Sequence, residues 1–191
     1  MSKYDNSLVV KDALQRYFSE YNFNDGGYTA KWFRIVLGPV SFPLPNIKSR
    51  VDAVKIHDIH HLVTEYRADN KGEAEIGAWE FARGCSKFSV AWLLNLGSIL
   101  IGIFICPRRL LRAFLRGRKC TTNFYFEKSY DDLLDKTLGE LRKKIEIDFP
   151  RKAKTNDFLL FFGWCFIALA YHVGVLLIFV YALYHLYLFF A

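Results

Sequence analysis

The last part of the chain lacks charge. From Phe158 to Ala191 there is no Lys, Arg, Asp or Glu, and only His172 and His185 can titrate near neutral pH. An apolar run of more than ~18 residues is typical of a membrane-embedded helix. This run is longer than a straight helix needs to cross a hydrocarbon core of ~30 Å. We therefore predict a kink near Gly174 or a short helical hairpin.

Other absences narrow the class of protein. The chain has four cysteines, Cys85, Cys106, Cys120 and Cys165. Their spacing is not of the metal-binding or thioredoxin type, so we predict that they serve as small apolar side chains in a reducing compartment. The N-terminus lacks the long apolar core of a secretory signal. There are no internal repeats. A mainly helical unit with membrane-embedded helices is the simplest prediction.

Basic residues outnumber acidic ones, which gives a net charge of +7. Between residues 108 and 119, arginines are interleaved with apolar side chains such as Leu110 and Phe114. This pattern favours an anionic membrane surface over nucleic acid, although a solvated, topology-setting charge cluster has the same appearance. Basic residues flank the uncharged segment Phe88–Cys106 on both sides, so we predict that this segment is re-entrant or interfacial.

The predicted fold class is all-α, with a helical domain over residues 1–157 and a membrane-embedded region over 158–191. Apolar periodicity and capping patterns, including Asp5 or Asn6 and Ser129-x-x-Asp132, predict the main helices. Residues 31–37 fit either a strand or a buried helix start, and the following prolines make regular structure improbable before Ile47. The predicted helices span residues 5–21, 49–66, 73 onward and 129–147.

The residues that carry chemistry lie in one stretch, His57-Asp58-Ile59-His60-His61, followed by Glu73. On a helix, His57 and His61 fall one turn apart on one face, with Asp58 and His60 displaced to either side. Imidazole and carboxylate groups bind Zn, Fe or Mn, and a His pair at this spacing is a recurrent way to hold such an ion. Glu73 begins the next predicted helix and is placed to reach back.

Ordinary structural roles are open to the same residues. A single His-x-x-x-His pair is often only a solvated face, and Glu73 would favour the dipole of its helix without binding metal. Glu65, one turn beyond His61, fits a pairing partner of His61 better than a ligand. His172 and His185 fit buried or interfacial side chains better than ligands.

The pattern His57-Asp58-x-x-His61-x(11)-Glu73 resembles the signature of the coenzyme Q biosynthesis protein four family. The flanking stretches His60–Tyr66 and Gly72–Glu80 are also similar, and the resemblance is strongest over residues 55–85. It implies that His57, Asp58, His61 and Glu73 bind a divalent metal ion, zinc or iron. The chain departs from the family pattern at Glu65, where a small residue is expected, and in its long apolar C-terminal run.

The resemblance implies a role in ubiquinone biosynthesis. Members of the family are implicated in oxidative decarboxylation of the head-group precursor, and have also been viewed as lipid-binding scaffolds for the other biosynthetic enzymes. The implied partners are a polyprenyl quinone precursor, membrane lipids and those enzymes. A homo-oligomer is compatible with this role, and no nucleic-acid partner is expected. The implied location is the cytoplasmic face of a bacterial inner membrane or an equivalent energy-transducing membrane.

Two further hypotheses concern the histidines. His60 is a candidate proton-transfer group beside the metal. His57-x-x-His60-His61 also has the spacing of a histidine box in membrane desaturases and hydroxylases, which hold two irons. Those enzymes use about eight histidines, whereas this chain has five.

Overall fold

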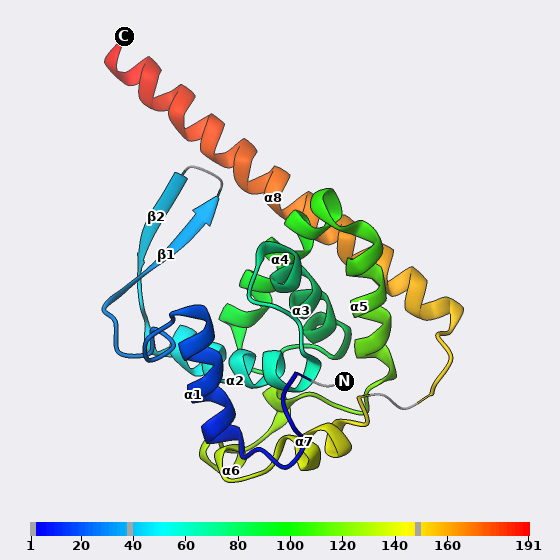
Figure 1. Cartoon of the computed structure of the whole chain (residues 1–191). Coiled ribbons are helices and arrows are strands. Elements are labelled where there is room, and N and C mark those ends of the chain that lie inside the picture. The colour runs from blue at the N-terminus through cyan, green and yellow to red at the C-terminus, as the bar shows by residue number, and fades with distance from the viewer. Residues whose placement is uncertain (1–2, 38–39, 148–149) are drawn as a thin grey trace.

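The computed structural model describes residues 3–37, 40–147 and 150–191. In this part of the chain, eight α-helices and one β-hairpin form a helical body from which a long C-terminal helix projects (Figure 1). The mainly helical prediction is therefore confirmed. The helices are α1 (Val10–Tyr21), α2 (Lys48–Thr64), α3 (Asn70–Arg83), α4 (Ser89–Ile105), α5 (Pro107–Lys119), α6 (Asp131–Leu134), α7 (Leu138–Ile145) and α8 (Thr155–Phe190).

The first helix starts later than predicted. Residues 5–8 form a turn and Val9 forms an isolated β-bridge with Thr137. Hydrogen bonds run from Val10 N–H to the Lys136 carbonyl (2.9 Å) and from Leu138 N–H to the Leu8 carbonyl (2.9 Å). Asp5 accepts hydrogen bonds from Ser7 in a local turn and does not cap α1. A long-range pairing thus replaces the predicted first turn.

The prediction of irregular structure before Ile47 is wrong. Trp32–Leu37 (β1) pairs antiparallel with Val40–Pro45 (β2), which places Pro43 opposite Arg34. Gly38 and Pro39 lie outside the described residues. Proline is tolerated in a two-stranded hairpin because each strand is an edge. Pro43 and Pro45 are two residues apart, so their missing N–H groups face the same way and leave the other residues to form the ladder.

The body is built around α3, which packs closely against α5 and α4. Gly117 of α5 makes this possible, because a Cβ there would lie 2.4 Å from the Trp79 carbonyl oxygen of α3. Gly102 of α4 likewise allows a close approach to α5, because a Cβ there would lie 2.5 Å from Leu110 Cδ1. The tight three-helix contact holds α3 in place, and α2 packs on a second face of the body beside α1 and α7 (Figure 1).

The predicted helix 129–147 is two helices. Chain direction changes between α6 and α7, and Thr137 caps α7 by accepting a hydrogen bond from Glu140 N–H (3.2 Å) while Glu140 accepts one from Thr137 N–H (2.7 Å). The sequence contains this Thr-x-x-Glu capping box, a stronger start signal than Ser129-x-x-Asp132.

Replacing Thr137 with Ala removes this cap. We expect the free energy of unfolding to fall by about 1 kcal/mol, the usual cost of losing an N-cap side chain. Denaturant titration of the full chain in detergent measures the change. Thr137→Ser keeps the hydroxyl and is expected to stay within about 0.5 kcal/mol of the wild type; equal values for Ala and wild type would contradict the capping role.

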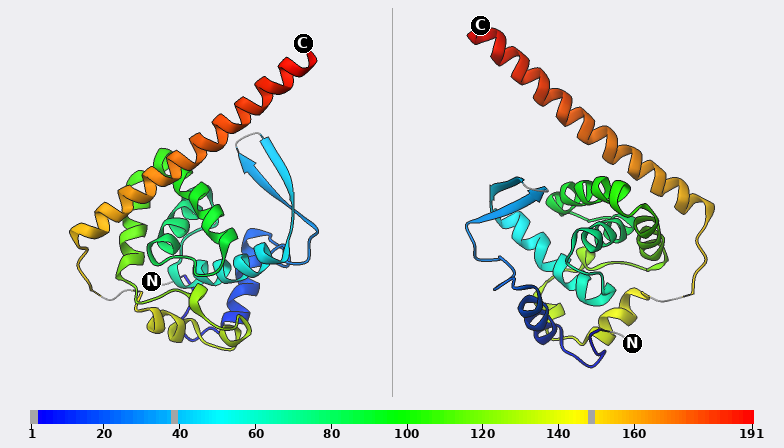
Figure 2. Two further views of the ribbon diagram at one scale, coloured as in Figure 1. Left: turned by 180° about the vertical axis from the view of Figure 1, so that it is seen from behind. Right: turned by 45° about the horizontal axis from the view of Figure 1, so that its top comes forward.

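The C-terminal run forms one continuous helix. The 36 residues of α8 pass through Gly174 without interruption, so the prediction of a kink or hairpin is wrong (Figure 2). The first half packs on the body through two aromatic contacts. The ring centroids of Phe161 and Phe114 are 5.5 Å apart, and those of Trp164 and Phe81 are 4.7 Å apart. The second half, residues 173–190, projects away and is called the free half of α8.

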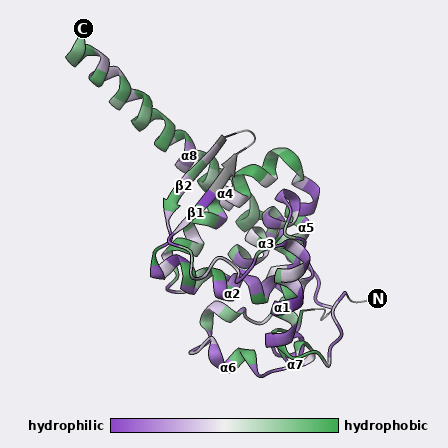
Figure 3. Ribbon diagram, turned by 60° about the vertical axis from the view of Figure 1, so that its left-hand side comes forward, coloured by the Kyte–Doolittle hydropathy of each residue, from purple (hydrophilic) through white to green (hydrophobic). Residues whose placement is uncertain are grey.

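The free half of α8 has no Lys, Arg, Asp or Glu and is mainly apolar, with His185 and three tyrosines toward its end (Figure 3). Its 18 residues correspond to about 27 Å of helix, close to the ~30 Å of a hydrocarbon core. By length and composition α8 can cross a membrane. α4 is apolar but shorter and is partly enclosed by α3, α5 and α8; its re-entrant placement in a membrane stays a prediction.

Candidate metal centre

Three of the predicted ligands converge between α2 and α3. His57 and His61 lie one turn apart on α2, and their Nε2 atoms are 3.1 Å from each other. Glu73, in the first turn of α3, places Oε2 3.3 Å from His57 Nε2 and Oε1 3.2 Å from His61 Nε2. In the described part of the chain, this is the only group of three or more His, Cys, Asp or Glu side chains whose ligand atoms lie so close together.

The hydrogen bonds around the two rings fix their tautomers. His57 Nδ1 lies 2.9 Å from Glu80 Oε1, and His61 Nδ1 lies 2.9 Å from the Tyr66 carbonyl oxygen. Both partners are acceptors, so each Nδ1 carries the proton and donates it. Each Nε2 then faces the other Nε2 and Glu73, and presents a lone pair there when its ring is neutral. Two lone pairs and a carboxylate at this separation repel one another unless a cation or a proton lies between them.

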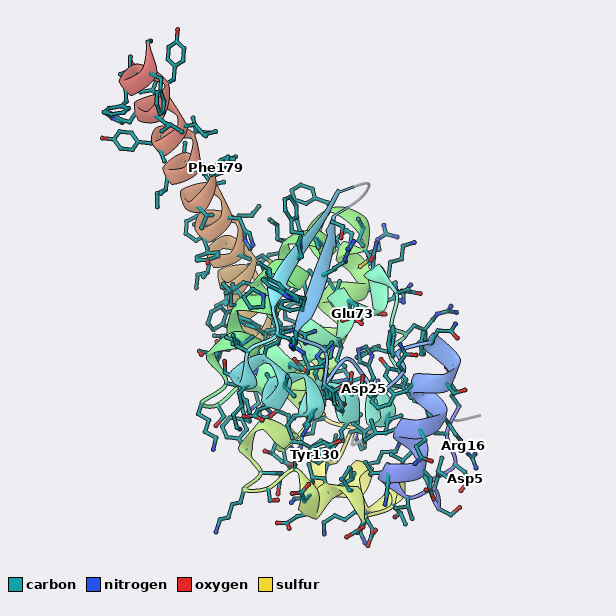
Figure 4. All side chains as sticks on the ribbon, turned by 90° about the vertical axis from the view of Figure 1, so that its left-hand side faces the viewer. Asp5, Arg16, Asp25, Glu73, Tyr130 and Phe179 are labelled. Atoms are coloured by element: carbon teal, nitrogen blue, oxygen red, sulfur yellow. The ribbon has the colours of Figure 1, made fainter. Side chains whose placement is uncertain are left out.

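The distances fit a metal ion. Ligands bound tetrahedrally at ~2.0–2.1 Å are about 3.3 Å apart, and the three observed separations are 3.1, 3.2 and 3.3 Å. Histidines that bind metals commonly donate their other ring nitrogen to a carboxylate or a backbone carbonyl, as both do here. Glu73 keeps 42% of its side-chain surface exposed, and Figure 4 shows it on the face of the body between the hairpin and α1. The centre is therefore open on one side.

Glu80 is the residue that sequence reasoning missed. It lies seven residues after Glu73 on the same face of α3 and is completely buried. Its carboxylate accepts four hydrogen bonds, which come from His57 Nδ1 (2.9 Å), His60 Nδ1 (2.7 Å), Asn95 Nδ2 (2.7 Å) and Tyr125 hydroxyl (3.1 Å). The seven-residue spacing from Glu73 is the signal that could have identified it.

The same contacts set the charge of Glu80. Burial would raise the pKa of its carboxyl, but the imidazoles of His57 and His60 outweigh burial and hold the pKa well below its usual range. A buried carboxylate with four donors satisfies the requirement that buried charge be paired. Glu80 is thus an anion that fixes His57 and joins α2, α3, α4 and η1 (Phe124–Phe126) in one polar network.

His60 belongs to this network and not to the open centre. It is fully buried between aromatic rings, and while its Nδ1 donates to Glu80, its Nε2 accepts the Phe124 backbone N–H at 3.0 Å. Burial lowers the pKa of His60. Both ring nitrogens form hydrogen bonds within the buried network, so the geometry indicates a structural role for His60. Proton transfer by His60 stays a prediction without support from its contacts.

Asp58 lies beside the converging atoms but outside their group. It is buried, and its Oδ2 accepts a hydrogen bond of 2.6 Å from the Tyr28 hydroxyl. Burial raises the pKa of Asp58 to about 6, an effect that the nearby His57 partly opposes. The structure therefore brings together three of the four residues that the family signature implies. Coordination by Asp58 stays a prediction.

Glu65 ends α2 and positions His61. It adopts a left-handed conformation (φ 64°), which turns the chain so that the Tyr66 carbonyl reaches His61 Nδ1. Its carboxylate pairs with Arg142 at 2.8 Å, and Arg142 also donates to the Leu62 carbonyl at the end of α2 (3.0 Å). The predicted pairing of Glu65 with His61 is replaced by this backbone role. The negative charge of Glu65 is compensated by Arg142.

Metal binding at this centre is expected to compete with protons. Burial alone would lower the pKa of His57, but the carboxylates of Glu80 and Glu73 outweigh it and hold the pKa well above its usual range. Burial would raise the pKa of Glu73, yet the imidazoles hold it well below its usual range, so Glu73 is ionised at all ordinary pH values. A metal ion must therefore displace a proton from His57.

The expected result is an affinity that rises with pH. Below the raised pKa of His57, the dissociation constant for Zn²⁺ should fall about tenfold per pH unit, because one proton is released for each ion bound. Calorimetry in buffers of different ionisation enthalpy measures this proton release. Release of no proton at pH 7 would show that the ring is already neutral and would contradict the assignment.

The remaining histidines lie on α8. His172 Nδ1 donates to the Ala168 carbonyl (2.7 Å), and the ring of His185 packs on Tyr181 at 4.3 Å. Neither belongs to the group formed by His57, His61 and Glu73. The two-iron desaturase hypothesis would need a second cluster, and the described residues supply one cluster.

Comparison with known proteins adds no assignment. No match is found among protein-family models, curated proteins or solved structures. The family resemblance consequently depends on the short motif and the residues around it.

Proposed function

We propose that the chain is a membrane-associated protein of ubiquinone biosynthesis that binds a divalent metal ion, zinc or iron, and acts in the oxidative decarboxylation of a polyprenylated head-group precursor. The supporting observation is the convergence of His57 Nε2, His61 Nε2 and the Glu73 carboxylate, each ring held in the tautomer that a metal requires. The apolar α8 supports the membrane part of the proposal.

Different residues of the chain would bind the ion, orient its ligands and receive the substrate. His57, His61 and Glu73 hold the ion, with Asp58 beside them as the fourth candidate ligand. A bound ion would supply a Lewis acid that polarises the carboxylate to be lost or would help to engage dioxygen, which would be the oxidant. Glu80 and the Tyr66 carbonyl keep the two imidazoles oriented, and the exposed side of Glu73 is where an aromatic head group would approach. The polyprenyl tail would lie against the apolar surface near α4 and α8.

A second candidate function is a lipid-binding scaffold for other biosynthetic enzymes, with a structural metal. The exposed apolar surface of α8 supports it, because such a surface can contact lipid and membrane-bound partner enzymes. In this case the metal would hold α2 to α3 and take no part in a reaction.

The experiment that tests the proposal is the variant Glu73→Gln, expressed in cells whose quinone production depends on the chain. Glu73 is half exposed, so its replacement should leave the fold intact. We expect normal protein abundance, little quinone and accumulation of a carboxylated precursor. The matched control Glu20→Gln, also on the surface, should leave quinone output unchanged.

Three other results would count against a role in oxidative decarboxylation. Normal quinone output with Glu73→Gln would overturn a metal-dependent step. Loss of the protein itself would support the structural metal of the scaffold hypothesis. A ratio of two irons per chain would support the desaturase-like hypothesis.

A further inference from the structure

The hairpin β1–β2 exposes large apolar side chains. Trp32 is 61% exposed, Phe42 51% and Leu44 39%. Phe42 and Leu44 share one face of the hairpin and Trp32 lies on the other, so large apolar side chains are exposed on both faces. Single exposed apolar residues are common on soluble proteins, but three on twelve residues of one hairpin favour a partner.

The base of the hairpin is firmly attached to the body. The Asn46 side chain donates to the carbonyls of Gly27 and Ala30, both at 2.8 Å, and accepts from Arg50 at 2.7 Å. The Arg50 guanidinium also lies 3.9 Å from the centroid of the Phe33 ring. Beyond this base the two strands pair mainly with each other. The hairpin is therefore an arm that is attached to the body at its base.

This arm points to the same side of the body as the free half of α8. Figure 1 shows the strands β1 and β2 running from the body toward the region into which α8 projects, and the left view of Figure 2 shows the same arrangement. α8 is the one candidate membrane span in the described residues, and its free half is the part that does not pack on the body. A bilayer that contains the free half would therefore lie on the side where the hairpin ends.

The charges along the arm match the polarity of a lipid surface. Lys31 and Arg34 are exposed near the base of the hairpin, whereas residues 35–42 include no charged residue. Cations at the level of the headgroups and apolar residues beyond them are the arrangement found in segments that dip into an anionic bilayer. A Trp at the boundary, as Trp32 is here, is typical of the interface.

We propose that the hairpin β1–β2 is a second membrane contact, whose outer part enters the interface of the bilayer that holds the free half of α8. Lys31 and Arg34 meet anionic headgroups together with Trp32 and Leu44, and Phe42, which lies beyond Arg34 along the hairpin, reaches the upper acyl carbons. Two separated contacts fix the orientation of the body on the membrane, which a single helix cannot do. The proposal does not depend on the metal centre.

The test measures how deeply the hairpin enters the bilayer. Membrane binding itself is not informative, because α8 alone would keep every variant in the membrane. A spin label is placed at Phe42→Cys, and at Phe126→Cys as a matched control in η1. Phe126 is 53% exposed, nearly equal to Phe42, and has no place in the hairpin. The full chain carries Cys165→Ala, since Cys165 is the cysteine that is not buried. It is reconstituted into vesicles of phosphatidylcholine and phosphatidylglycerol.

The label at 42 is expected to be relaxed at least about threefold more by oxygen, relative to a water-soluble nickel complex, than the label at 126. In vesicles of phosphatidylcholine alone, this difference should shrink as the headgroup attraction is lost. Equal accessibility of both labels to the nickel complex would overturn the proposal. So would dipolar coupling between labels at 42 in different chains, which would identify a second copy as the partner.

Discussion

Replacing Glu80 with Ala is expected to lower the free energy of unfolding by about 3–5 kcal/mol, the usual result of breaking a buried, hydrogen-bonded ion pair. The change leaves His57, His60, Asn95 and Tyr125 without the acceptor they share in a fully buried place. Each unsatisfied buried donor adds to the cost. Denaturant titration of the full chain in detergent measures the difference.

A surface carboxylate provides the control for this effect. Glu20 pairs with Lys3 and is 43% exposed, so Glu20→Ala should cost no more than about 1 kcal/mol. The isosteric change Glu80→Gln separates orientation from packing. It retains the shape but weakens the acceptor for His57 Nδ1, and we expect Zn²⁺ affinity to fall about 10–100-fold while the protein stays folded. Unchanged affinity would contradict the role of Glu80 in orienting His57.

Replacing His61 with Ala is expected to abolish stoichiometric metal binding. His61 supplies one of three converging ligand atoms, and its ring is nearly completely buried, stacked on Tyr17 with ring centroids 5.5 Å apart. Loss of a ligand should cost more than the ~10–100-fold typical of an outer hydrogen-bond partner. Elemental analysis of the purified chain and Zn²⁺ titration measure this result.

His172→Ala is the control for this variant. His172 lies on α8 and hydrogen-bonds within its own helix, so its loss should leave metal content unchanged. Asp58→Asn adds a comparison, because Asp58 lies outside the converging group and binds Tyr28. We expect its loss of affinity to be smaller than that of His61→Ala. An equal loss would show that Asp58 is a direct ligand.

The sequence was most informative where local periodicity decides the structure. The spacing of His57 and His61 placed them on one helical face, and Glu73 was expected to reach back from the next helix; the structure brings these three together. The uncharged run after residue 157 predicted a helix that can cross a membrane, and α8 has that length and composition.

Long-range pairing explains the main errors. The first turn of α1 could not be excluded from the sequence, because residues 136–139 compete for its backbone groups. The strand β2 was missed since its prolines oppose regular structure, while a two-stranded hairpin tolerates them. The continuity of α8 through Gly174 reflects the absence of any packing that would require a bend there.

Glu80 was missed for a different reason. In the sequence it is one acid in a helix that also contains Glu73 and Glu75, and its burial depends on Asn95 and Tyr125 from distant segments. His60 was predicted to be a candidate proton-transfer group, although a one-residue step on a helix turns its side chain by ~100° away from that of His61. The order of residues alone does not separate the ligands from the residues that hold them.

The most direct measurement is X-ray absorption spectroscopy of the purified full chain, combined with its metal content. The convergence of two imidazoles and one carboxylate predicts about one ion per chain, with two histidine nitrogens among four to five ligands at ~2.0–2.1 Å. A chain that remains folded but retains no metal after incubation with Zn²⁺ or Fe²⁺, or whose ion shows no imidazole scattering, would contradict the assignment of this centre.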